Sequence, residues 1–199
     1  MSATALSLAL ILSACGGGSD TPAPSPLLAK YAGTWSACNG AGQLTRIVLS
    51  LATDESLQAR SETDYFANAD CSGSAGATLV YNPTGDSVKS SGTAGVVAIF
   101  PNDQKRSITA DIGELNRVAA VPKVLSMGMT VSRSVLNGVA EVCISGVAGQ
   151  TYCFKEADMT VAAGTDLILF MVEGDVLYLL DQNDNTSDGA FRARPYRRS

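Results

Sequence analysis

The spacing of short β-rich runs constrains the fold of this chain more than any other feature. After Leu27 these runs alternate with Gly, Asn and Asp, and no stretch of about ten residues has helical periodicity. We therefore predict an all-β domain, with a short helical segment at 25–31 before the first strand. The predicted strands are 33–37, 44–51, 57–66, 77–82, 87–91, 95–100, 106–112, 124–132, 141–145, 151–155, 166–173, 175–182 and 190–196.

One hairpin stands out as central. The runs 167–172 and 176–180 are almost continuously apolar and flank the turn Glu173–Asp175. A strand whose two faces are both apolar is buried on both sides. We expect this hairpin to lie in the middle of the sheet.

The number of strands predicts a closed or layered antiparallel architecture. The chain has 199 residues and 46% hydrophobic residues, enough for one core. Eight to ten antiparallel strands in a single domain at 27–199 indicate a β-barrel, with a β-sandwich as the alternative.

The amino terminus resembles that of bacterial lipoproteins. Residues 3–14 form an apolar run, too short to span a bilayer, and Leu12-Ser13-Ala14-Cys15 resembles the lipobox, although no Lys or Arg precedes the run. The resemblance implies a signal peptide at 1–14 and a diacylglyceryl group on Cys15. Two or three acyl chains hold a protein stably at a membrane. Residues 15–26, rich in Gly, Ser and Pro, then form a flexible linker.

The same resemblance implies a cellular location, the bacterial cell envelope. An envelope protein meets an oxidising compartment, and the Gly at position 16, where Asp would favour inner-membrane retention, favours the outer membrane. Cys38, Cys71, Cys143 and Cys153 remain after lipidation. We expect two disulfides, Cys143–Cys153 across a Gly-containing hairpin and Cys38–Cys71, rather than a four-thiolate zinc site.

A second resemblance concerns the barrel. The segment Tyr31-Ala32-Gly33-Thr34-Trp35 is similar to the aromatic-x-Gly-x-Trp motif that opens the first strand of lipocalins and related calycins. The resemblance implies that Gly33 and Trp35 close one end of the barrel and that a late arginine lies across the indole. Arg192 or Arg194 is the expected partner, through a cation–π contact.

Composition excludes several function classes. The chain has no His, which removes His-based triads, His metal ligands and His pH switches. Its formal net charge is −5, although four of its fourteen basic residues lie within the last eight positions. This distribution argues against a nucleic-acid surface. No nucleophile has a visible partner, so we expect no enzyme activity and no cofactor.

An acidic loop is the remaining candidate for chemistry. Residues 181–189 alternate oxygen-bearing side chains as a calcium loop does, but their turn-forming composition needs no ion, and we expect no metal. Asp54, Glu55, Glu62 and Asp64 show no pairing that spacing establishes, and we interpret them as solvated.

These patterns together predict a lipid-anchored envelope protein. We expect a lipocalin-like barrel that binds a small apolar ligand or serves a structural role, non-enzymatic and held at the membrane. The alternative is a tethered β-sandwich that binds an envelope protein.

The anchor has a direct test. Replacing the acceptor thiol by Cys15→Ser removes the acyl chains, so the protein should move from the membrane pellet to the soluble fraction of a bacterial host. Immunoblotting of the two fractions measures the shift. Unchanged membrane association would contradict the lipobox interpretation.

Overall fold

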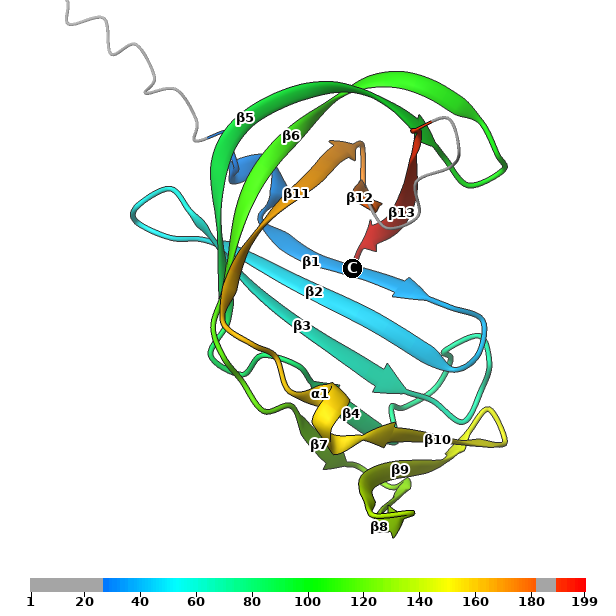
Figure 1. Ribbon diagram of the computed structural model, residues 1–199. Helices are drawn as coiled ribbons and strands as arrows, with labels where there is room; N and C mark the ends of the chain where they lie inside the picture. Colours follow the sequence, from blue (N-terminus) through cyan, green and yellow to red (C-terminus); the bar gives the residue numbers. More distant parts are fainter. Residues whose placement is uncertain (1–26, 182–188) are drawn as a thin grey trace, which may run out of the picture.

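The computed structural model describes residues 27–181 and 189–199, whose regular structure is almost entirely strands (Figure 1). The all-β prediction is confirmed. Predicted strands 87–91 and 95–100 are one long strand, and predicted strand 124–132 divides in two. The elements are η1 (Ala29–Tyr31), β1 (Gly33–Cys38), β2 (Gln43–Leu51), β3 (Leu57–Tyr65), β4 (Ala77–Val80), β5 (Asp86–Ile99), β6 (Lys105–Arg117), β7 (Lys123–Ser126), β8 (Thr130–Leu136), β9 (Val139–Val147), β10 (Gln150–Lys155), α1 (Glu156–Met159), β11 (Gly164–Glu173), β12 (Val176–Asp181) and β13 (Phe191–Arg198).

Eight of the described strands pair in a closed circuit. The order is β1–β2–β3–β5–β6–β11–β12–β13, and β13 returns to β1. Every pair in this circuit is antiparallel. The order of the strands in the circuit is also their order along the chain, as in an up-and-down barrel. The segment from β7 to α1 is inserted between β6 and β11, and β4 branches from the end of β3.

The two longest strands, β5 and β6, also build a second layer. Their register shifts between Ser90 and Gly92, and Gly92 has a φ of 128°, a conformation that side chains disfavour. Beyond this bulge the hairpin arches over β11, β12 and β13 (Figure 1). Residues Ala98–Ile99 then pair in parallel with the start of β13, which closes a smaller circuit.

The hairpin of β11 and β12 is the wall shared by these two circuits. Ile168 and Phe170 face the interior of the larger circuit, together with Leu177 of β12. Leu169 and Leu180 face the interior of the smaller one. Because side chains alternate along a strand, one apolar run supplies both cores. This explains why the sequence is apolar on both faces, and the predicted central position is confirmed.

A third core lies under the inserted segment. The sheet β10–β9–β8 packs on β3, β4 and β7 through Tyr65, Leu79, Ile144 and Val147, all buried. Tyr65 also makes an edge-on contact with Phe154 of β10. The insertion is thereby attached to the barrel by apolar packing. Among the described residues no helix has the length and apolar character needed to cross a bilayer.

Trp35 closes one end of the larger circuit, but its arginine partner is not the expected one. The Arg198 Cζ atom lies 4.2 Å from the centroid of the Trp35 ring, which is fully buried. The Arg198 Nη1 atom also donates to the Ala32 carbonyl at 2.9 Å, and Trp35 Nε1 donates to the Tyr31 carbonyl at 2.8 Å. A side chain at Gly33 would place its Cβ 2.6 Å from Nη1, so glycine leaves the space that the guanidinium occupies.

The assignment of this contact to Arg192 or Arg194 is wrong, for a reason of register. Strand β13 pairs with β1 only at its far end, where Arg198 lies opposite Trp35. The earlier part of β13 pairs with β12, and Arg192 lies opposite Asp181. Arg194 forms an ion pair with Asp181 at 2.7 Å. Both expected residues therefore lie away from the indole.

Removing the guanidinium should show which arginine holds the closed end. Arg198→Gln loses the cation–π contact and two hydrogen bonds, and should lower the free energy of unfolding by about 1–2 kcal/mol. Arg192→Gln, the control, should change it by less than about 0.5 kcal/mol. Urea unfolding followed by Trp35 fluorescence measures both. Equal effects of the two substitutions would contradict the assignment.

Candidate functional site

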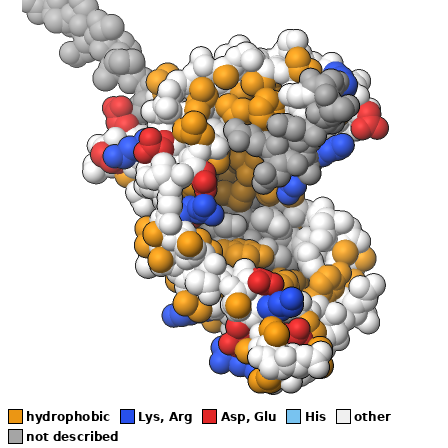
Figure 2. All heavy atoms as spheres, viewed as in Figure 1, with side chains coloured by type: hydrophobic (Ala, Val, Ile, Leu, Met, Phe, Trp, Pro, Cys, Tyr) orange, Lys and Arg blue, Asp and Glu red, His pale blue; other side chains and the backbone are white. Residues whose placement is uncertain are grey.

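The larger circuit encloses a cavity of about 720 Å³. In the space-filling view the centre of the molecule is hollowed, with hydrophobic side chains on its floor and charged side chains at its margin (Figure 2). A cavity of this size falls within the range of small-molecule sites. Its apolar lining comes from six strands and includes Ile47, Leu49, Leu57, Ala59, Val88, Leu115, Ile168, Phe170, Leu177 and Leu179.

Strand periodicity aims these side chains inward. In β2, Ile47 and Leu49 are two residues apart, and the same spacing relates Leu57 and Ala59 in β3. Gly113 of β6 leaves the space that the Phe170 and Val88 side chains occupy, because a Cβ there would lie 2.6 Å from an atom of each. The cavity wall is therefore built by ordinary alternation of side chains and by one glycine that makes room for its neighbours.

The inner end of the cavity is sealed by the segment that precedes β1. The Tyr31 ring packs edge-on against Phe170 with centroids 4.5 Å apart, and its hydroxyl donates to Asp111. Lys30 Nζ lies 2.8 Å from the same carboxylate. Burial and the adjacent Asp111 carboxylate raise the pKa of Tyr31 far above its usual value, so the phenol stays protonated. This end of the barrel is a plug of hydrogen-bonded aromatic residues.

The lining of the opposite end, which we call the mouth, carries six charged residues. Arg117 pairs with Asp166, and Arg194 pairs with Asp181, so both ion pairs lie on the β6–β11–β12–β13 side. The third carboxylate, Asp86, and the third arginine, Arg60, are considered next. The six residues are Arg60, Asp86, Arg117, Asp166, Asp181 and Arg194.

Asp86 and Arg60 differ in whether their charged groups have hydrogen-bond partners. Asp86 accepts hydrogen bonds from the Asn82 side chain and from the Val118 amide, the latter at 3.0 Å. Arg60, on the neighbouring strand, is exposed and forms neither an ion pair nor a hydrogen bond within the described part of the chain. Every carboxylate of the mouth has a partner. The Arg60 side chain alternates with those of Ala59 and Ser61 along β3 and therefore lies on the outer face of the strand.

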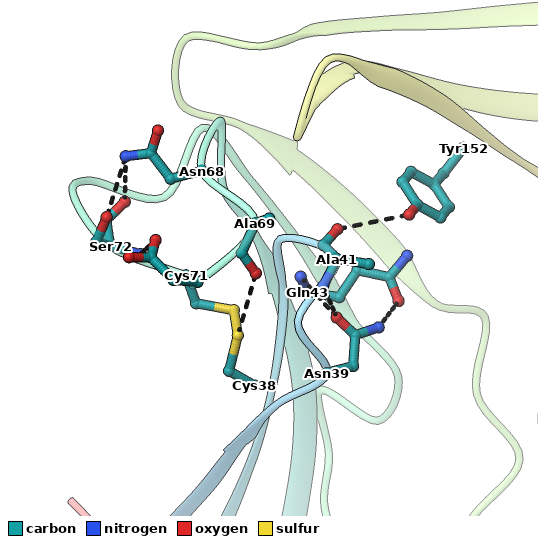
Figure 3. The surroundings of a disulfide bond; sticks show 10 residues. Cys38, Asn39, Ala41, Gln43, Asn68, Ala69, Cys71, Ser72 and Tyr152 are labelled. Atoms are coloured by element: carbon teal, nitrogen blue, oxygen red, sulfur yellow. Dashed lines mark hydrogen bonds between the residues drawn. A yellow bond between two sulfur atoms is a disulfide. The ribbon is translucent and has the colours of Figure 1, made fainter.

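The two expected disulfides are present. Cys38–Cys71 joins the end of β1 to the loop after β3, where hydrogen bonds of Asn39 and Asn68 hold both turns (Figure 3). Cys143 and Cys153 lie directly opposite one another in β9 and β10. Glu141 lies close to this second pair, but bonded sulfurs offer no thiolate to a metal.

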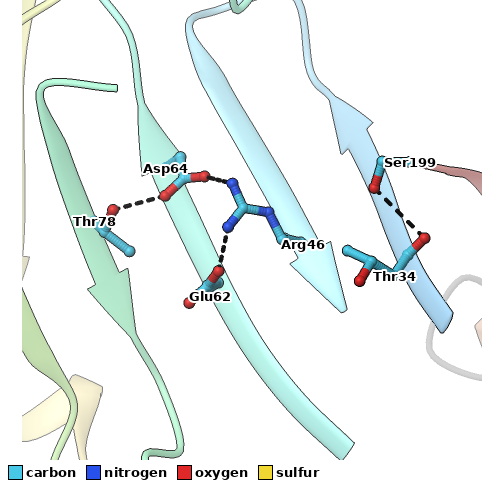
Figure 4. Close-up of polar contacts among 6 residues, drawn as sticks. All are labelled: Thr34, Arg46, Glu62, Asp64, Thr78 and Ser199. Atoms are coloured by element: carbon cyan, nitrogen blue, oxygen red, sulfur yellow. Dashed lines mark hydrogen bonds and ion pairs between the residues drawn. The ribbon is translucent and has the colours of Figure 1, made fainter. Parts of the chain in front are cut away.

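A buried carboxylate outside the cavity departs from the sequence interpretation. Asp64 is 3% exposed, and it accepts hydrogen bonds from Arg46 and, at 2.6 Å, from the Thr78 hydroxyl (Figure 4). Arg46 also binds Glu62. The expectation that Asp64 is solvated is therefore wrong. Asp64 is the centre of a clamp across β2, β3 and β4. Both of its oxygens are engaged, which assigns it to structure.

Two expectations fall on residues that are not described. Cys15 and the linker lie outside the described residues, and of the acidic loop only Asp181 and Gly189 lie inside them. Among the remaining expected residues, Gly33 and Trp35 lie together at the closed end. Arg198 and Arg46 were not singled out from the sequence, because their roles depend on which strand lies beside them.

Comparison with known proteins identifies no family for this chain. No family model matches the chain, and no curated protein or solved structure matches it either. Its function has to be inferred from the site itself.

The clamp predicts unequal effects of its two carboxylates. Asp64→Ala leaves Arg46 and Thr78 without a buried partner and should lower the free energy of unfolding by about 2 kcal/mol or more. Glu62→Ala removes a more exposed ion pair and should cost less than about 1 kcal/mol. Chemical denaturation of both variants measures the difference. A smaller effect of Asp64→Ala than of Glu62→Ala would contradict the structural role.

Proposed function

We propose that this domain is a non-enzymatic carrier that binds a small, mainly apolar molecule inside the barrel. The observation that carries the proposal is the cavity of about 720 Å³ lined by apolar side chains from six strands. Removing apolar surface from water supplies the binding energy in such a site, at roughly 25 cal/mol per Å². The charged mouth leaves a polar end for the solvent-facing part of the ligand.

The contrast between the two circuits supports a binding role. The interior of the smaller circuit is filled by Phe100 and Tyr178, whose rings meet edge-on at 4.9 Å, together with alanines of three strands. In the larger circuit, large aromatic side chains gather at the closed end, around Trp35 and Tyr31. A barrel needed only as a scaffold gains stability from a filled interior. An unfilled apolar interior costs stability and is expected where a ligand enters.

The cell envelope is the proposed location. The lipobox-like segment ending at Cys15 and the two disulfides support it, since disulfides persist in oxidising compartments. We propose that the domain is held at the membrane, preferably the outer membrane, by acyl chains on Cys15 and a flexible linker. In this arrangement the barrel lies close to the membrane surface and can bind apolar molecules that leave the membrane.

Filling the cavity tests the binding role. Ala59→Trp places a large ring among Ile47, Leu57 and Val88 and should weaken binding of the uncharged dye N-phenyl-1-naphthylamine by at least about tenfold. Dye fluorescence titrated against protein measures the affinity. Ala140→Trp, at an exposed position of β9, is the matched control and should bind the dye as the native protein does.

Thermal unfolding of both variants shows that they are folded. Native mass spectrometry of the full-length protein purified from a bacterial envelope should in addition show a copurified small molecule. A native protein that binds no apolar dye and emerges without such a molecule would overturn the proposal.

A second candidate function is protein binding by the inserted segment. Strand β8 is an edge of its three-stranded sheet, and Val135 and Leu136 at its end are 72% and 59% exposed. Exposed apolar side chains on an edge strand are typical of a surface that receives a strand from a partner. Val135→Lys should then abolish crosslinking to an envelope protein without affecting dye binding. Unchanged crosslinking would exclude this surface.

A further inference from the structure

The mouth has three carboxylates but only two inward-facing guanidinium groups. Arg117 pairs with Asp166 at 2.5 Å, which occupies the first carboxylate. Arg194 pairs with Asp181 at 2.7 Å, which occupies the second. Asp86 also lines the cavity, but it forms no ion pair within the described part of the chain. Its negative charge is therefore not balanced by a cation of the mouth.

The register of β3 and β5 places Asp86 on the inner face of the barrel. Leu57 lies opposite Val88 in this ladder, and both side chains belong to the core of the larger circuit. Ala59 lies opposite Asp86, two residues away from the first pair on each strand. Because alternate side chains of a strand share one face, Asp86 shares the inner face with Val88 and Ala59.

The hydrogen bonds of Asp86 leave one of its oxygens open. The Asn82 side-chain amide and, at 3.0 Å, the Val118 backbone amide both donate to Oδ1. Both donors are neutral, and Oδ2 accepts no hydrogen bond from residues 27–181 and 189–199. A carboxylate has about four acceptor sites on its two oxygens. These bonds hold the side chain in place without neutralising its charge.

The inner face beside Asp86 provides further oxygen atoms. Ser61 lines the cavity two residues beyond Ala59, so it is a diagonal neighbour of Asp86, and such neighbours lie roughly 7–8 Å apart. Thr45 lines the cavity next to Ser61 on β2. Neither hydroxyl has a hydrogen-bond partner among the described residues. Because Arg60 faces outward, this side of the mouth presents a carboxylate and two hydroxyls without a cation.

We infer that the ligand carries a protonated amine at its polar end, and that Asp86 binds this ammonium group while the apolar part enters the barrel. The inference rests on the proposed function. An ammonium group donates up to three hydrogen bonds and accepts none, so it matches Oδ2 of Asp86 and the hydroxyl oxygen of Ser61. An anionic head group would be repelled by Asp86, and it would have to displace an ion pair to reach a guanidinium.

The partial exposure of Asp86 sets the size of the expected effect. The side chain lies at the mouth, so a bound ammonium group keeps contact with water. An ion pair in such a position contributes modestly and is screened by salt, so we expect a preference of roughly tenfold. The apolar part then provides most of the affinity, and Asp86 provides the selection.

The experiment compares ligands that differ in the head group. Three twelve-carbon compounds, dodecylamine, dodecanol and dodecanoate, compete with N-phenyl-1-naphthylamine for the full-length protein, each below its micelle concentration. The amine is protonated near neutral pH, as the Lys side chain is. We expect it to displace the dye at roughly tenfold lower concentration than dodecanol, and dodecanoate to be no better than dodecanol. Raising the salt concentration should reduce the preference.

Substitutions at the mouth complete the test. Asp86→Asn keeps an oxygen acceptor for Asn82 and Val118, and it should remove the preference for the amine while leaving the dodecanol affinity unchanged. Asp175→Asn makes the same change of charge at an exposed turn beside the closed end, and should keep the preference. Ser61→Ala leaves the hydrogen bonds of Asp86 intact and should reduce the preference by about threefold. Thermal unfolding shows that all three variants are folded.

Failure of this inference differs from failure of the proposed function. Equal displacement by the amine and dodecanol, a preference for dodecanoate, or a preference that survives Asp86→Asn would overturn the ammonium group while the apolar site stands. An unchanged preference in Ser61→Ala would overturn its placement beside β3. Absence of dye binding by the native protein would overturn both proposals. A native protein that binds the dye but releases it to none of the three competitors would exclude a single-chain amphiphile and overturn the inference.

Discussion

The burial of β11 and β12 on both faces is the constraint on which the rest of the structure depends. One face of this hairpin lines the larger circuit and the other lines the smaller circuit. Neither face can be exposed to water without losing an apolar core, so the hairpin has to lie between two layers of strands. The long arch of β5 and β6 follows from this requirement, because the second face needs a cover that the larger circuit cannot supply.

The same constraint separates a packed interior from the interior in which we propose that a ligand binds. The smaller circuit is packed by aromatic rings and alanines, and it holds the shared wall in place. The larger circuit is sealed at one end by Trp35, Tyr31 and Arg198 and retains a cavity toward the other. The packed core holds the wall formed by β11 and β12 in place. If this wall moved into the cavity, it would lose its contacts with the packed core, so the unfilled core keeps its shape. This arrangement suits a carrier whose site is formed before the ligand arrives.

Parts of the fold were predictable because they depend on neighbours along the chain. The hairpin of Cys143 and Cys153 is local, and its disulfide follows from turn chemistry and strand register. The start of β1 with Gly33 and Trp35 was likewise visible as a motif. By contrast, the partner of Trp35 was misassigned to Arg192 or Arg194. The reason is that β13 reaches β1 only at its last residues, and nothing within β13 itself signals where that contact falls.

By itself the sequence determined the all-β class, the central apolar hairpin and the local Cys143–Cys153 pair, since alternation and turn residues act over short distances along the chain. Only the tertiary structure decided which charges are neutralised. Asp64 is buried in a clamp with Arg46, whereas Arg60, four residues earlier on the same strand, has no partner among the described residues. The physical reason is that the interaction of two charges depends on their separation in space, and that separation is set by the register of strands distant in sequence.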